Sequence, residues 1–468
     1  MQWQLPIAAV AVYLVVRRPP RRLAIFIVAV GTGLTLLGAA YFFTRYRSLF
    51  GDAFDDTSRG MVALLATLKP GIGDDVWGLS IVNQAWLFFK YGLLWFLPNP
   101  NWMSIDIHPV FPLSVTGFPQ LLGIPLYLGA LVGSILLMTR YKDWRRLLGL
   151  GLFLPLCLFV TEFALVWIQD PFVLYRSYLW AIGVPLLGSL FLIGSKPRTI
   201  TLITVAIGLV LCGLSLERVF SFKSEAAVWA DAAAKVELDA PLNAVGRWRP
   251  LLNHGNQLMQ QGLADEAAKA YAAASQMSDP SGLSDYHLGI ALMQLGQPTA
   301  AGEALAKAET GWAMKADYKD QLNLQKGQLA FQTGHYEQAI AELDQALGKL
   351  SDTDFRRAAL ETRAKAHIKI GHAAAAISDF QQILQIAPGD RKARIGLAMS
   401  LRADHQSELA LKTLDALLAE QDDVNVRIAR ILTLNDLGRR AAAQEELRLA
   451  LAKNPDNKLL NAMATRHP

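Results

Sequence analysis

Cysteine and charge are both scarce in this sequence. Only 2 of the 468 residues are cysteines, and both, Cys157 and Cys212, lie inside apolar runs, which excludes a disulfide framework. Charged residues make up 18% of the chain, below the roughly 25% of an ordinary soluble domain. The sequence also has no phosphate-binding glycine loop, no G-x-S-x-G elbow and no paired-cysteine motif. These absences exclude a single soluble globule and the common soluble active sites.

The charges that are present divide the chain into two unlike halves. Residues 1–222 hold 17 Lys/Arg, 10 Asp/Glu and 8 of the 11 tryptophans, together with several long apolar runs. Residues 223–468 hold 28 Lys/Arg and 30 Asp/Glu in a background rich in Ala, Leu and Gln. The halves sum to +7 and −2, which gives the formal charge of +5. Because the surplus positive charge flanks apolar runs, it indicates a membrane protein and no nucleic-acid partner.

The first half contains segments that are long and apolar enough to cross a bilayer, which takes roughly 20 residues. We expect about six spans, the first of them short, at 4–16, 22–43, 119–139, 147–168, 178–195 and 199–217. Arginines follow the first segment instead of preceding it, which favours a transmembrane helix over a cleaved signal peptide. Residues 81–98 are apolar but rich in aromatics, which predicts a helix that lies in or re-enters the outer membrane interface.

Basic residues orient these spans. They concentrate in three short loops, as Arg17, Arg18, Arg21 and Arg22, as Arg140, Lys142, Arg145 and Arg146, and as Lys196 and Arg198. By the positive-inside rule these loops are cytoplasmic, so loops 44–118 and 169–177 face outward. The second half of the chain then also lies outside, in the periplasm of a bacterium or the lumen of the endoplasmic reticulum of a eukaryote. We expect a bacterial inner-membrane protein in contact with membrane lipid.

The second half is built from an internal repeat. Small residues recur as Ala267, Ala301, Ala339, Ala376, Ala410 and Ala443, with spacings of 34, 38, 37, 34 and 33 residues. A large apolar residue follows each of them four positions later. This pattern resembles the tetratricopeptide repeat (TPR), which predicts six helix pairs over 248–457, after a connector at 223–247 and before a tail at 458–468. Such pairs stack into a superhelix whose groove binds an extended or helical protein segment.

Polar residues in the outward loops are the candidates for chemistry. The adjacent Asp55 and Asp56 could hold a divalent cation or act as a base, although a solvated turn or a helix cap is the simpler interpretation. Asp106 and His108 lie in a Pro-rich loop and are either structural or part of a site. Arg176 begins a span, so it is either an interfacial anchor or a clamp on a lipid phosphate. The histidines indicate no metal site, because seven of the eight are scattered through the second half.

Three segments resemble the transmembrane-and-TPR O-mannosyltransferases and their bacterial relatives. The matching residues are Gln84, Tyr91, Leu93 and Pro98 followed by Ser104, Asp106, His108 and Pro109; then Arg176, Ser177, Tyr178, Leu179 and Gly183; and finally Trp229 and Asp231 with Arg247 or Arg249. Leu174 and Tyr175 replace a Glu-His pair of that family, and Trp180 replaces its proline. The segments together cover most of residues 1–300, and each motif is short.

The resemblance implies a GT-C type membrane glycosyltransferase that takes sugar from a polyprenyl-phosphate donor on the outer face. It makes Asp106 and His108 the candidate catalytic residues and Arg176 with Tyr178 the candidate ligands of the donor phosphate. The further loop candidates are Asp55, Asp56, Gln84 and Tyr91. In that family an acidic catalytic residue lies in the first outward loop near the N-terminus, so this chain is expected to begin after the catalytic part.

The sequence therefore predicts an all-α protein, with a polytopic membrane domain over 1–222 and a TPR α-solenoid behind it. The expected function is transfer of sugar from the lipid-linked donor to a protein or glycan, with the repeats binding the acceptor or a partner. One alternative is a non-catalytic membrane-anchored TPR scaffold for envelope or pilus assembly. A second is an O-antigen ligase or polymerase type of enzyme. The sequence indicates no definite cofactor and leaves a divalent cation open.

Overall fold

The computed structural model describes residues 3–47, 50–51, 53, 55–315, 318–348 and 350–466. Within these ranges the chain is helical, and its strand-like pairings are two isolated bridges, Phe50 with Leu165 and Ile107 with Phe172. The chain divides into two compact units, Met1–His287 and Leu288–Pro468. The unit boundary therefore lies later than the predicted domain boundaries, because the first helix pair of the repeats belongs to the N-terminal unit.

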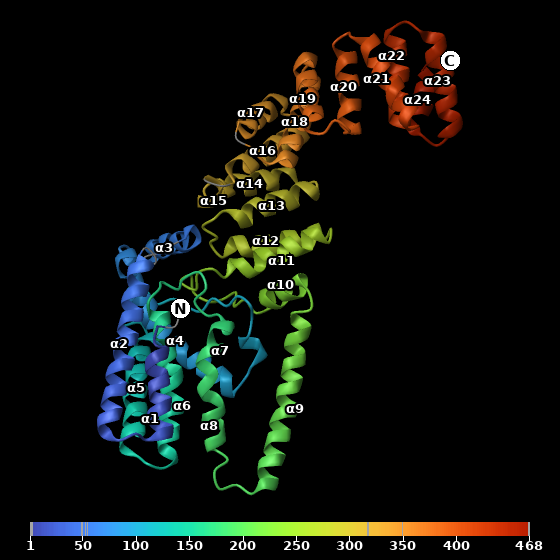
Figure 1. Cartoon of the computed structure of the whole chain (residues 1–468). Helices are drawn as coiled ribbons and strands as arrows, with labels where there is room; N and C mark the ends of the chain where they lie inside the picture. Colours follow the sequence, from blue (N-terminus) through green and yellow to red (C-terminus); the bar gives the residue numbers. More distant parts are fainter. Residues whose placement is uncertain are drawn as a thin grey trace. The chain divides into compact units, whose positions relative to one another are not determined.

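Helices make up most of the N-terminal unit (Figure 1). They are α1 (Leu5–Arg17), α2 (Arg21–Arg45), α3 (Asp56–Leu68), α4 (Ile72–Phe96), α5 (Gly123–Arg140), α6 (Trp144–Phe159), α7 (Ser177–Trp180), α8 (Val184–Leu190) and α9 (Pro197–Ser221), followed by α10 (Glu225–Ala234). α6 packs on α1, α5 and α8. These contacts are close because α6 carries glycines: a Cβ on Gly149 would lie 2.7 Å from the carbonyl oxygen of Ser134 in α5, and one on Gly151 would lie 2.8 Å from Leu187 in α8.

Four helices are long and apolar enough to cross a membrane: Arg21–Arg45, Gln120–Arg140, Trp144–Phe163 and Pro197–Ser221. They coincide with four of the predicted spans. The first predicted span corresponds to α1, which is apolar but has only 13 residues. α9 differs from the other three because none of its side chains is buried, and the elements it packs on include α10 and the 3-10 turn Pro100–Trp102.

The span predicted at 178–195 is not one continuous helix, and its crossing of a membrane stays a prediction. This segment is divided into α7, a 3-10 turn at Ala181–Gly183 and α8, which ends at Leu190. Gly183 lies so close to α6 that a Cβ would come within 2.2 Å of the carbonyl oxygen of Gly151, and Pro185 follows in the first turn of α8. Proline has no N–H to continue the hydrogen bonds of the preceding turn, so the helix is interrupted there.

The aromatic segment predicted at 81–98 belongs to α4, which starts nine residues earlier, at Ile72, and ends at Phe96. Its buried side chains include Val82, Gln84, Leu87 and Tyr91, and α4 packs on α3 and α5. The aromatics therefore contribute to the core of the unit. An interfacial position of this helix in a membrane stays a prediction.

The repeats form six helix pairs within the described residues. They are α11 (Trp248–Gln260) with α12 (Ala264–Gln276), α13 (Leu283–Gln294) with α14 (Pro298–Ala308), α16 (Lys319–Gln332) with α17 (Tyr336–Leu347), α18 (Thr353–Lys369) with α19 (Ala373–Ile386), α20 (Arg391–Ala403) with α21 (Ser407–Glu420), and α22 (Val424–Asp436) with α23 (Arg440–Lys453). A short helix, α15 (Trp312–Lys315), occupies the longest spacing between anchors. α24 (Lys458–Arg466) packs on α23 and buries Leu460, so the predicted tail contains a further helix.

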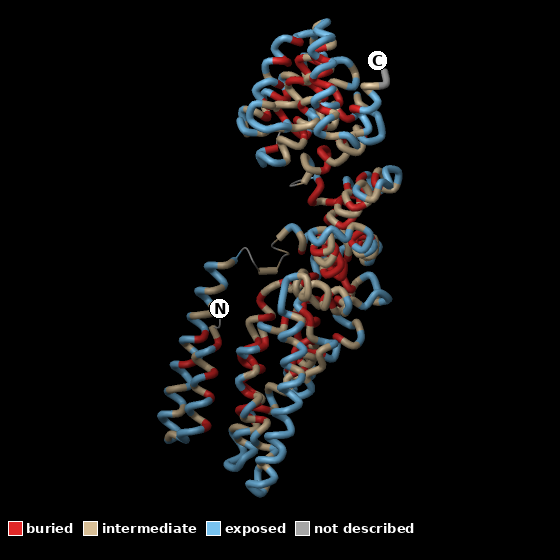
Figure 2. Tube along the Cα trace, turned by 90° about the vertical axis from the view of Figure 1, so that its right-hand side faces the viewer, coloured by how far each residue is buried: buried red, intermediate tan, exposed pale blue. Residues whose placement is uncertain are grey.

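Small residues hold each pair together, as the repeat pattern predicts. All six anchor alanines are at most 2% exposed. A Cβ on Gly289 would lie 2.7 Å from Leu305, and one on Gly327 would lie 2.6 Å from Leu343, so the helices of a pair cross closely at these positions. In Figure 2 the buried residues of the repeats gather between the helices and the exposed residues lie outside.

The first helices of the C-terminal unit lie on the inner side of its curve. α16 contacts α18, α18 contacts α20, and α20 contacts α22, whereas the second helices of neighbouring pairs make fewer contacts with one another. Elements on the inside of a curved stack come closer together than those on the outside. The first helices therefore line the concave surface.

Candidate functional site

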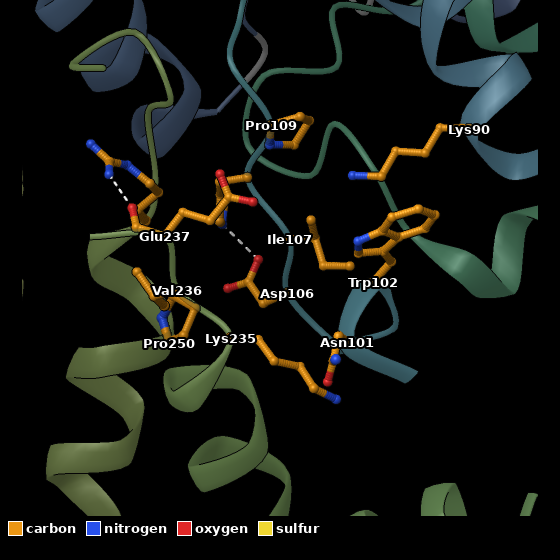
Figure 3. A pocket seen from close by; sticks show the side chains of 12 residues that line it. Lys90, Asn101, Trp102, Asp106, Ile107, Pro109, Lys235, Val236, Glu237 and Pro250 are labelled. Atoms are coloured by element: carbon orange, nitrogen blue, oxygen red, sulfur yellow. Dashed lines mark hydrogen bonds and ion pairs between the residues drawn. The ribbon is translucent and has the colours of Figure 1, made fainter. Parts of the chain in front are cut away.

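Three segments that are far apart in the sequence meet in the N-terminal unit: the loop 97–119, the loop 160–176 and the connector 235–247 (Figure 3). The bridge between Ile107 and Phe172 joins the two loops. Phe111 N donates to the carbonyl oxygen of Asn243 at 2.9 Å, and Asn243 Nδ2 donates to the carbonyl oxygen of Phe111 at 2.6 Å. We call these three segments, with the start of α11, the loop cluster.

Asp106 and His108, both predicted as candidates, lie side by side in the loop cluster. His108 Nε2 is 2.7 Å from Asp106 Oδ1. The side chain of His108 is 1% exposed and that of Asp106 is 6% exposed. Burial raises the pKa of Asp106, but the nearby His108 and Arg249 lower it by more, so the net pKa lies below its ordinary value. Asp106 Oδ2 and His108 Nδ1 are buried and make no hydrogen bond within the described residues.

Arg249, in the first turn of α11, supplies positive charge to the loop cluster. Its Nη1 donates to Asp170 Oδ1 and to the carbonyl oxygen of Gln169, each at 2.8 Å, and its Nε lies 3.6 Å from Asp106 Oδ2. Burial lowers the pKa of Arg249, while Asp106 and Asp170 raise it by more. A side chain of the first repeat helix thus joins carboxylates from two different loops.

The connector approaches His108 so closely that only glycine fits at position 246. Gly246 has a φ of +91°, and a Cβ on it would lie 2.4 Å from the imidazole ring of His108. The neighbouring Arg247 donates hydrogen bonds to carbonyl oxygens of the connector, among them Pro241 and Ala244. Arg247 therefore holds the connector in shape, whereas Arg249 binds the loops. The family resemblance had left open which of the two arginines matches the family's motif.

Arg176 is bound within the protein. Its guanidinium carbon lies 3.6 Å from the centre of the Trp167 ring, and its Nη1 donates to the carbonyl oxygen of Asp170 at 3.0 Å and lies 3.8 Å from the Glu162 carboxylate. The side chain is 12% exposed. Tyr178, predicted as its partner at a phosphate, is 76% exposed. The structure thus gives Arg176 partners of its own and leaves Tyr178 at the surface.

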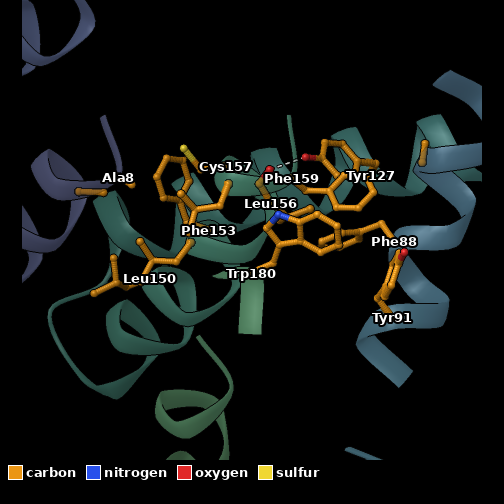
Figure 4. Close-up of a cluster of buried hydrophobic side chains, with 14 of the residues drawn as sticks. Ala8, Phe88, Tyr91, Tyr127, Leu150, Phe153, Leu156, Cys157, Phe159 and Trp180 are labelled. Atoms are coloured by element: carbon orange, nitrogen blue, oxygen red, sulfur yellow. Dashed lines mark hydrogen bonds between the residues drawn. The ribbon is translucent and has the colours of Figure 1, made fainter. Parts of the chain in front are cut away.

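Gln84 and Tyr91 of α4 hold the backbone of the loop 160–176. Gln84 Nε2 donates to the carbonyl oxygen of Pro171 at 2.8 Å, and the Tyr91 hydroxyl accepts from Val173 N at 2.7 Å. Both side chains are 1% exposed. In Figure 4 Tyr91 lies among buried aromatic rings, including those of Phe88, Phe159 and Trp180. These two candidates position a loop, because their polar atoms are already used by its backbone.

Asp55 is the N-cap of α3, which confirms the simpler of its two interpretations. Its carboxylate accepts from the backbone N–H and from the hydroxyl of Ser58, each at 2.7 Å. Asp56 forms an exposed ion pair with Arg59. Within the described parts of the chain, no three His, Cys, Asp or Glu side chains are grouped so that they could hold a metal ion.

A cavity of about 70 Å³ lies in the loop cluster beside Asp106 and His108. Lys90 of α4, Asn101 and Trp102 of the 3-10 turn, and Glu237 of the connector line it as well. Lys235 also lines this cavity, but its ammonium group is bound to Asp231 at 2.7 Å. The cavity is therefore small and polar, and it is lined by α4, the loop 97–119, the connector and the start of α11.

The sequence did not single out Lys90, Glu162, Trp167 and Glu237 as site residues. A signal existed for Glu162, since a carboxylate inside an apolar run has to find a partner when it is buried. Glu237 carries no such signal. It reaches the cavity because the connector folds back onto the loop 97–119, a contact between segments more than a hundred residues apart.

Comparisons with known proteins identify the repeats. The family model of the tetratricopeptide repeat matches residues 252–314 and 324–391. No curated protein matches the chain. Similar solved structures include pilF of Pseudomonas aeruginosa, with 16% identity, a TM-score of 0.38, and coverage of 47% of this chain and 97% of that one.

A tetratricopeptide repeat protein of Parabacteroides merdae has 15% identity, a TM-score of 0.37, and coverage of 53% of this chain and 93% of that one. YrrB, described as a TPR protein with an unusual peptide-binding site, has 17% identity, a TM-score of 0.30, and coverage of 52% and 99%. The matched family and the observed helix pairs agree. The C-terminal part of the chain consists of tetratricopeptide repeats.

Proposed function

We propose that this chain is a membrane-anchored TPR protein whose repeats bind a segment of another protein. The observation that carries the proposal is the series of six helix pairs, two stretches of which match the TPR family. Because the first helices line one concave surface, side chains from successive pairs can contact the same bound segment. The long apolar helices support the anchor. This is the scaffold function that the sequence left as an alternative.

Photo-crosslinking from lysine positions of the full-length chain tests the binding function. A crosslinking amino acid at Lys365 of α18 or Lys392 of α20, both exposed on first helices, should capture one and the same protein in native membranes. The matched control is the exposed Lys412 of α21, a second helix. Equal capture from Lys412 would contradict binding by the concave surface.

We further propose that the repeats lie outside the cytoplasm of a bacterium, because ten basic residues occupy the three alternate short loops. A reporter that is active only outside the cytoplasm should be active when it is fused after residue 222 or at the C-terminus. A reporter that is active only in the cytoplasm should be inactive at both places. The opposite result would reverse the orientation.

A second candidate function is sugar transfer at the loop cluster, as the resemblance to the O-mannosyltransferases implies. One observation favours it: Asp106 is a buried carboxylate with a lowered pKa beside a cavity, and its Oδ2 accepts no hydrogen bond from the described residues. Such a carboxylate accepts the proton of the acceptor's hydroxyl group. The oxygen of that hydroxyl then forms a bond to the sugar, while the bond from the sugar to the polyprenyl phosphate breaks and the phosphate leaves. The O-antigen ligase or polymerase type of reaction would use the same group.

Glycan transfer in cells that express the full-length gene product tests this second function. Asp106→Asn should abolish transfer and leave the protein abundant in membranes. Binding of the donor phosphate by Arg176 and Tyr178 stays a prediction, for which Arg176→Lys is the test because lysine lacks the paired donors of guanidinium. Normal glycan transfer by Asp106→Asn would contradict sugar transfer at the loop cluster. Protein binding by the repeats would then be the only proposed function that remains.

A further inference from the structure

Two strongly basic stretches lie at the same end of the N-terminal helices, where α1 turns into α2 and where α5 turns into α6 (Figure 1). Residues 17–22 contain four arginines, and residues 140–146 contain four basic residues and a single acid, Asp143. Eight positive charges and one negative charge give the two stretches a net charge of +7. We call them the basic patch, and its cations are Arg17, Arg18, Arg21, Arg22, Arg140, Lys142, Arg145 and Arg146.

Two hydrogen bonds join the two stretches. Arg18 Nη2 donates to the carbonyl oxygen of Lys142 at 2.9 Å, and Arg146 Nη2 donates to the carbonyl oxygen of Leu14, in the last turn of α1, at 2.8 Å. Arg18 has a φ of +51° at a helix end where glycine is usual, and its side chain makes one of these bonds. The protein therefore holds the charges of two distant turns in one place, although like charges repel one another. The positive-inside rule explains basic residues in each loop but does not require the loops to touch.

The cations of the basic patch lack a carboxylate partner. Within the described residues none of the eight forms an ion pair, and Asp143 caps α6 by accepting from Arg145 N at 3.0 Å. Seven of the eight side chains are exposed, and the eighth, Arg146, has a buried Nε without a hydrogen bond to the described residues. A guanidinium has five N–H donors, so donors remain on these arginines. The missing partner is an anion from outside the chain.

The surroundings of the basic patch show which kind of anion fits. Val16 of α1 and Phe26 of α2 are exposed apolar side chains close to it in the sequence. Tyr141 and Trp144 in the second stretch are exposed as well, and the guanidinium carbon of Arg145 lies 4.9 Å from the centre of the Tyr141 ring. Tyrosine and tryptophan at the ends of apolar helices are typical of the headgroup level of a membrane. A free phosphate would leave the apolar side chains uncovered, whereas a phospholipid supplies an anion and acyl chains together.

We propose that the basic patch binds the headgroup of an anionic phospholipid. Cations of both stretches contact the lipid phosphate, and the arginines among them do so through paired N–H donors. The acyl chains lie along the exposed apolar surface of α1 and α2. Basic pockets between membrane helices bind such headgroups because the cations lie at the level of the phosphates. This inference rests on the proposed membrane anchor, but it is independent of protein binding by the repeats and of sugar transfer.

Electron spin resonance of the full-length chain in phosphatidylcholine vesicles tests the inference. The probes are spin-labelled phosphatidylglycerol and cardiolipin, each compared with spin-labelled phosphatidylcholine. Lipid in contact with the protein moves more slowly than bulk lipid, so the slow fraction of each probe measures its binding. At least one of the two anionic probes should be enriched at the protein threefold or more over phosphatidylcholine. Equal slow fractions for all three probes would overturn the proposal.

Two further outcomes separate this lipid site from a soluble anion site and from the membrane anchor. Inorganic phosphate, added at unchanged ionic strength, should leave the anionic lipid at the protein. Displacement of the lipid by phosphate would assign the basic patch to a soluble anion and overturn the proposal. A chain that enters no vesicle would refute the membrane anchor and this inference with it. A chain that enters vesicles but shows no preference among lipids would refute this inference alone.

Variants in which cations are removed in pairs then locate the binding. Arg21→Gln together with Arg140→Gln removes one exposed cation from each stretch and should lower the preference for the anionic probe at least twofold. The matched control is Lys196→Gln together with Arg198→Gln, which removes two exposed cations from a third short loop and should leave the preference unchanged. Circular dichroism checks the fold, and Lys142→Gln replaces the first pair if that pair fails to fold. An equal loss in both pairs would assign the preference to the overall charge of the chain and overturn the proposal.

Discussion

Charged residues stabilise the repeats and the loop cluster in different ways. In the repeats, ion pairs such as Arg394–Glu420 and Arg439–Glu408 lie at the surface, where the carboxylates are 52% and 66% exposed. In the loop cluster, Asp106 is 6% exposed and Arg249 is 20% exposed. Water and salt screen such exposed pairs. The repeats also contain buried pairs, such as Arg363 with Asp379, whose side chains are 17% and 3% exposed, so the contrast is between the exposed pairs of the repeats and the buried charges of the loop cluster.

The two regions also differ in the sequence distance of their contacts. Tyr271 packs against Gly255 within one helix pair, and the anchor alanines recur at nearly constant spacing. Arg249, in contrast, binds Asp170 across 79 residues. The repeats therefore depend on many equivalent local contacts, whereas the loop cluster depends on a few long-range contacts that no neighbouring element can replace.

Removing one arginine from each region should give the largest contrast. Arg249→Ala leaves Asp106 and Asp170 without their shared cation, and removing one partner of a buried ion pair typically costs about 3–5 kcal/mol. Arg394→Ala in the repeats should cause little loss of stability, since its partner is exposed. Thermal unfolding of both full-length variants in one detergent measures the difference. Equal midpoint shifts would remove the contrast between buried and exposed pairs.

Substituting one glycine in each region sharpens the comparison. Gly262, in the turn after α11, has a φ of +78° with open space around it, so Gly262→Ala should cost only the backbone conformation, roughly 1–2 kcal/mol. Gly246→Ala adds a clash with His108 and should cost roughly 2–3 kcal/mol. Denaturant midpoints compare the two variants. A smaller loss at Gly246 would mean that the connector can move away from His108.

Over-packing tests the close crossings of the repeats. Ala339 is 0% exposed at the crossing of α16 and α17, so Ala339→Leu should destabilise the protein by ~1–3 kcal/mol. Ala374→Leu, at an exposed position of α19, is the control and should change stability by less than ~0.5 kcal/mol. Urea unfolding followed by circular dichroism measures both. If Ala339→Leu were as stable as the control, the anchor would not be a close-packed position.

The smallest expected effect is a pH dependence at His287, in the first helix of the second repeat pair. Burial lowers the pKa of His287 to about 4, from an ordinary value of 6.5. Folding favours the neutral form of His287. The stabilisation that this gives the folded state is therefore fully present above about pH 6.5 and is lost as the pH falls toward 4. Between pH 7 and pH 5 the free energy of unfolding should fall by roughly 1–2 kcal/mol.

His287→Gln should remove this part of the pH dependence, as measured by urea midpoints at the two pH values. The ionised carboxylate of Asp106 stabilises the folded state down to a more acidic pH, because the pKa of Asp106 lies below its ordinary value. An unchanged slope between pH 7 and pH 5 in His287→Gln would assign the titration to another group. The two regions should thus lose stability in different pH ranges.

The repeat half was predictable almost residue by residue, because each helix pair is a local unit with its own small residue, apolar stripe and turn. Ala339, for example, is buried because its position in the repeat pattern is the one where the two helices of a pair cross closely. The long apolar helices expected at 22–43, 119–139, 147–168 and 199–217 were equally predictable, since length and apolarity are local properties. The break in the helix at 178–195 has a specific cause. Gly183 lies close to α6 and Pro185 follows it, and together they interrupt a segment whose composition alone suggests one helix.

The sequence by itself determined the helical class, the six pairs and the placement of Asp106 and His108 in one loop, because these follow from periodicity and short spacing. The tertiary structure decided which side chains those two residues meet. In the folded chain Arg176 contacts Trp167 and Asp170, and Gln84 and Tyr91 bind a loop backbone. Arg249 lies beside Asp106 and Asp170, and Glu237 lines the cavity. Such contacts join segments that carry no common pattern, so only the folding of the connector back onto the loops creates them.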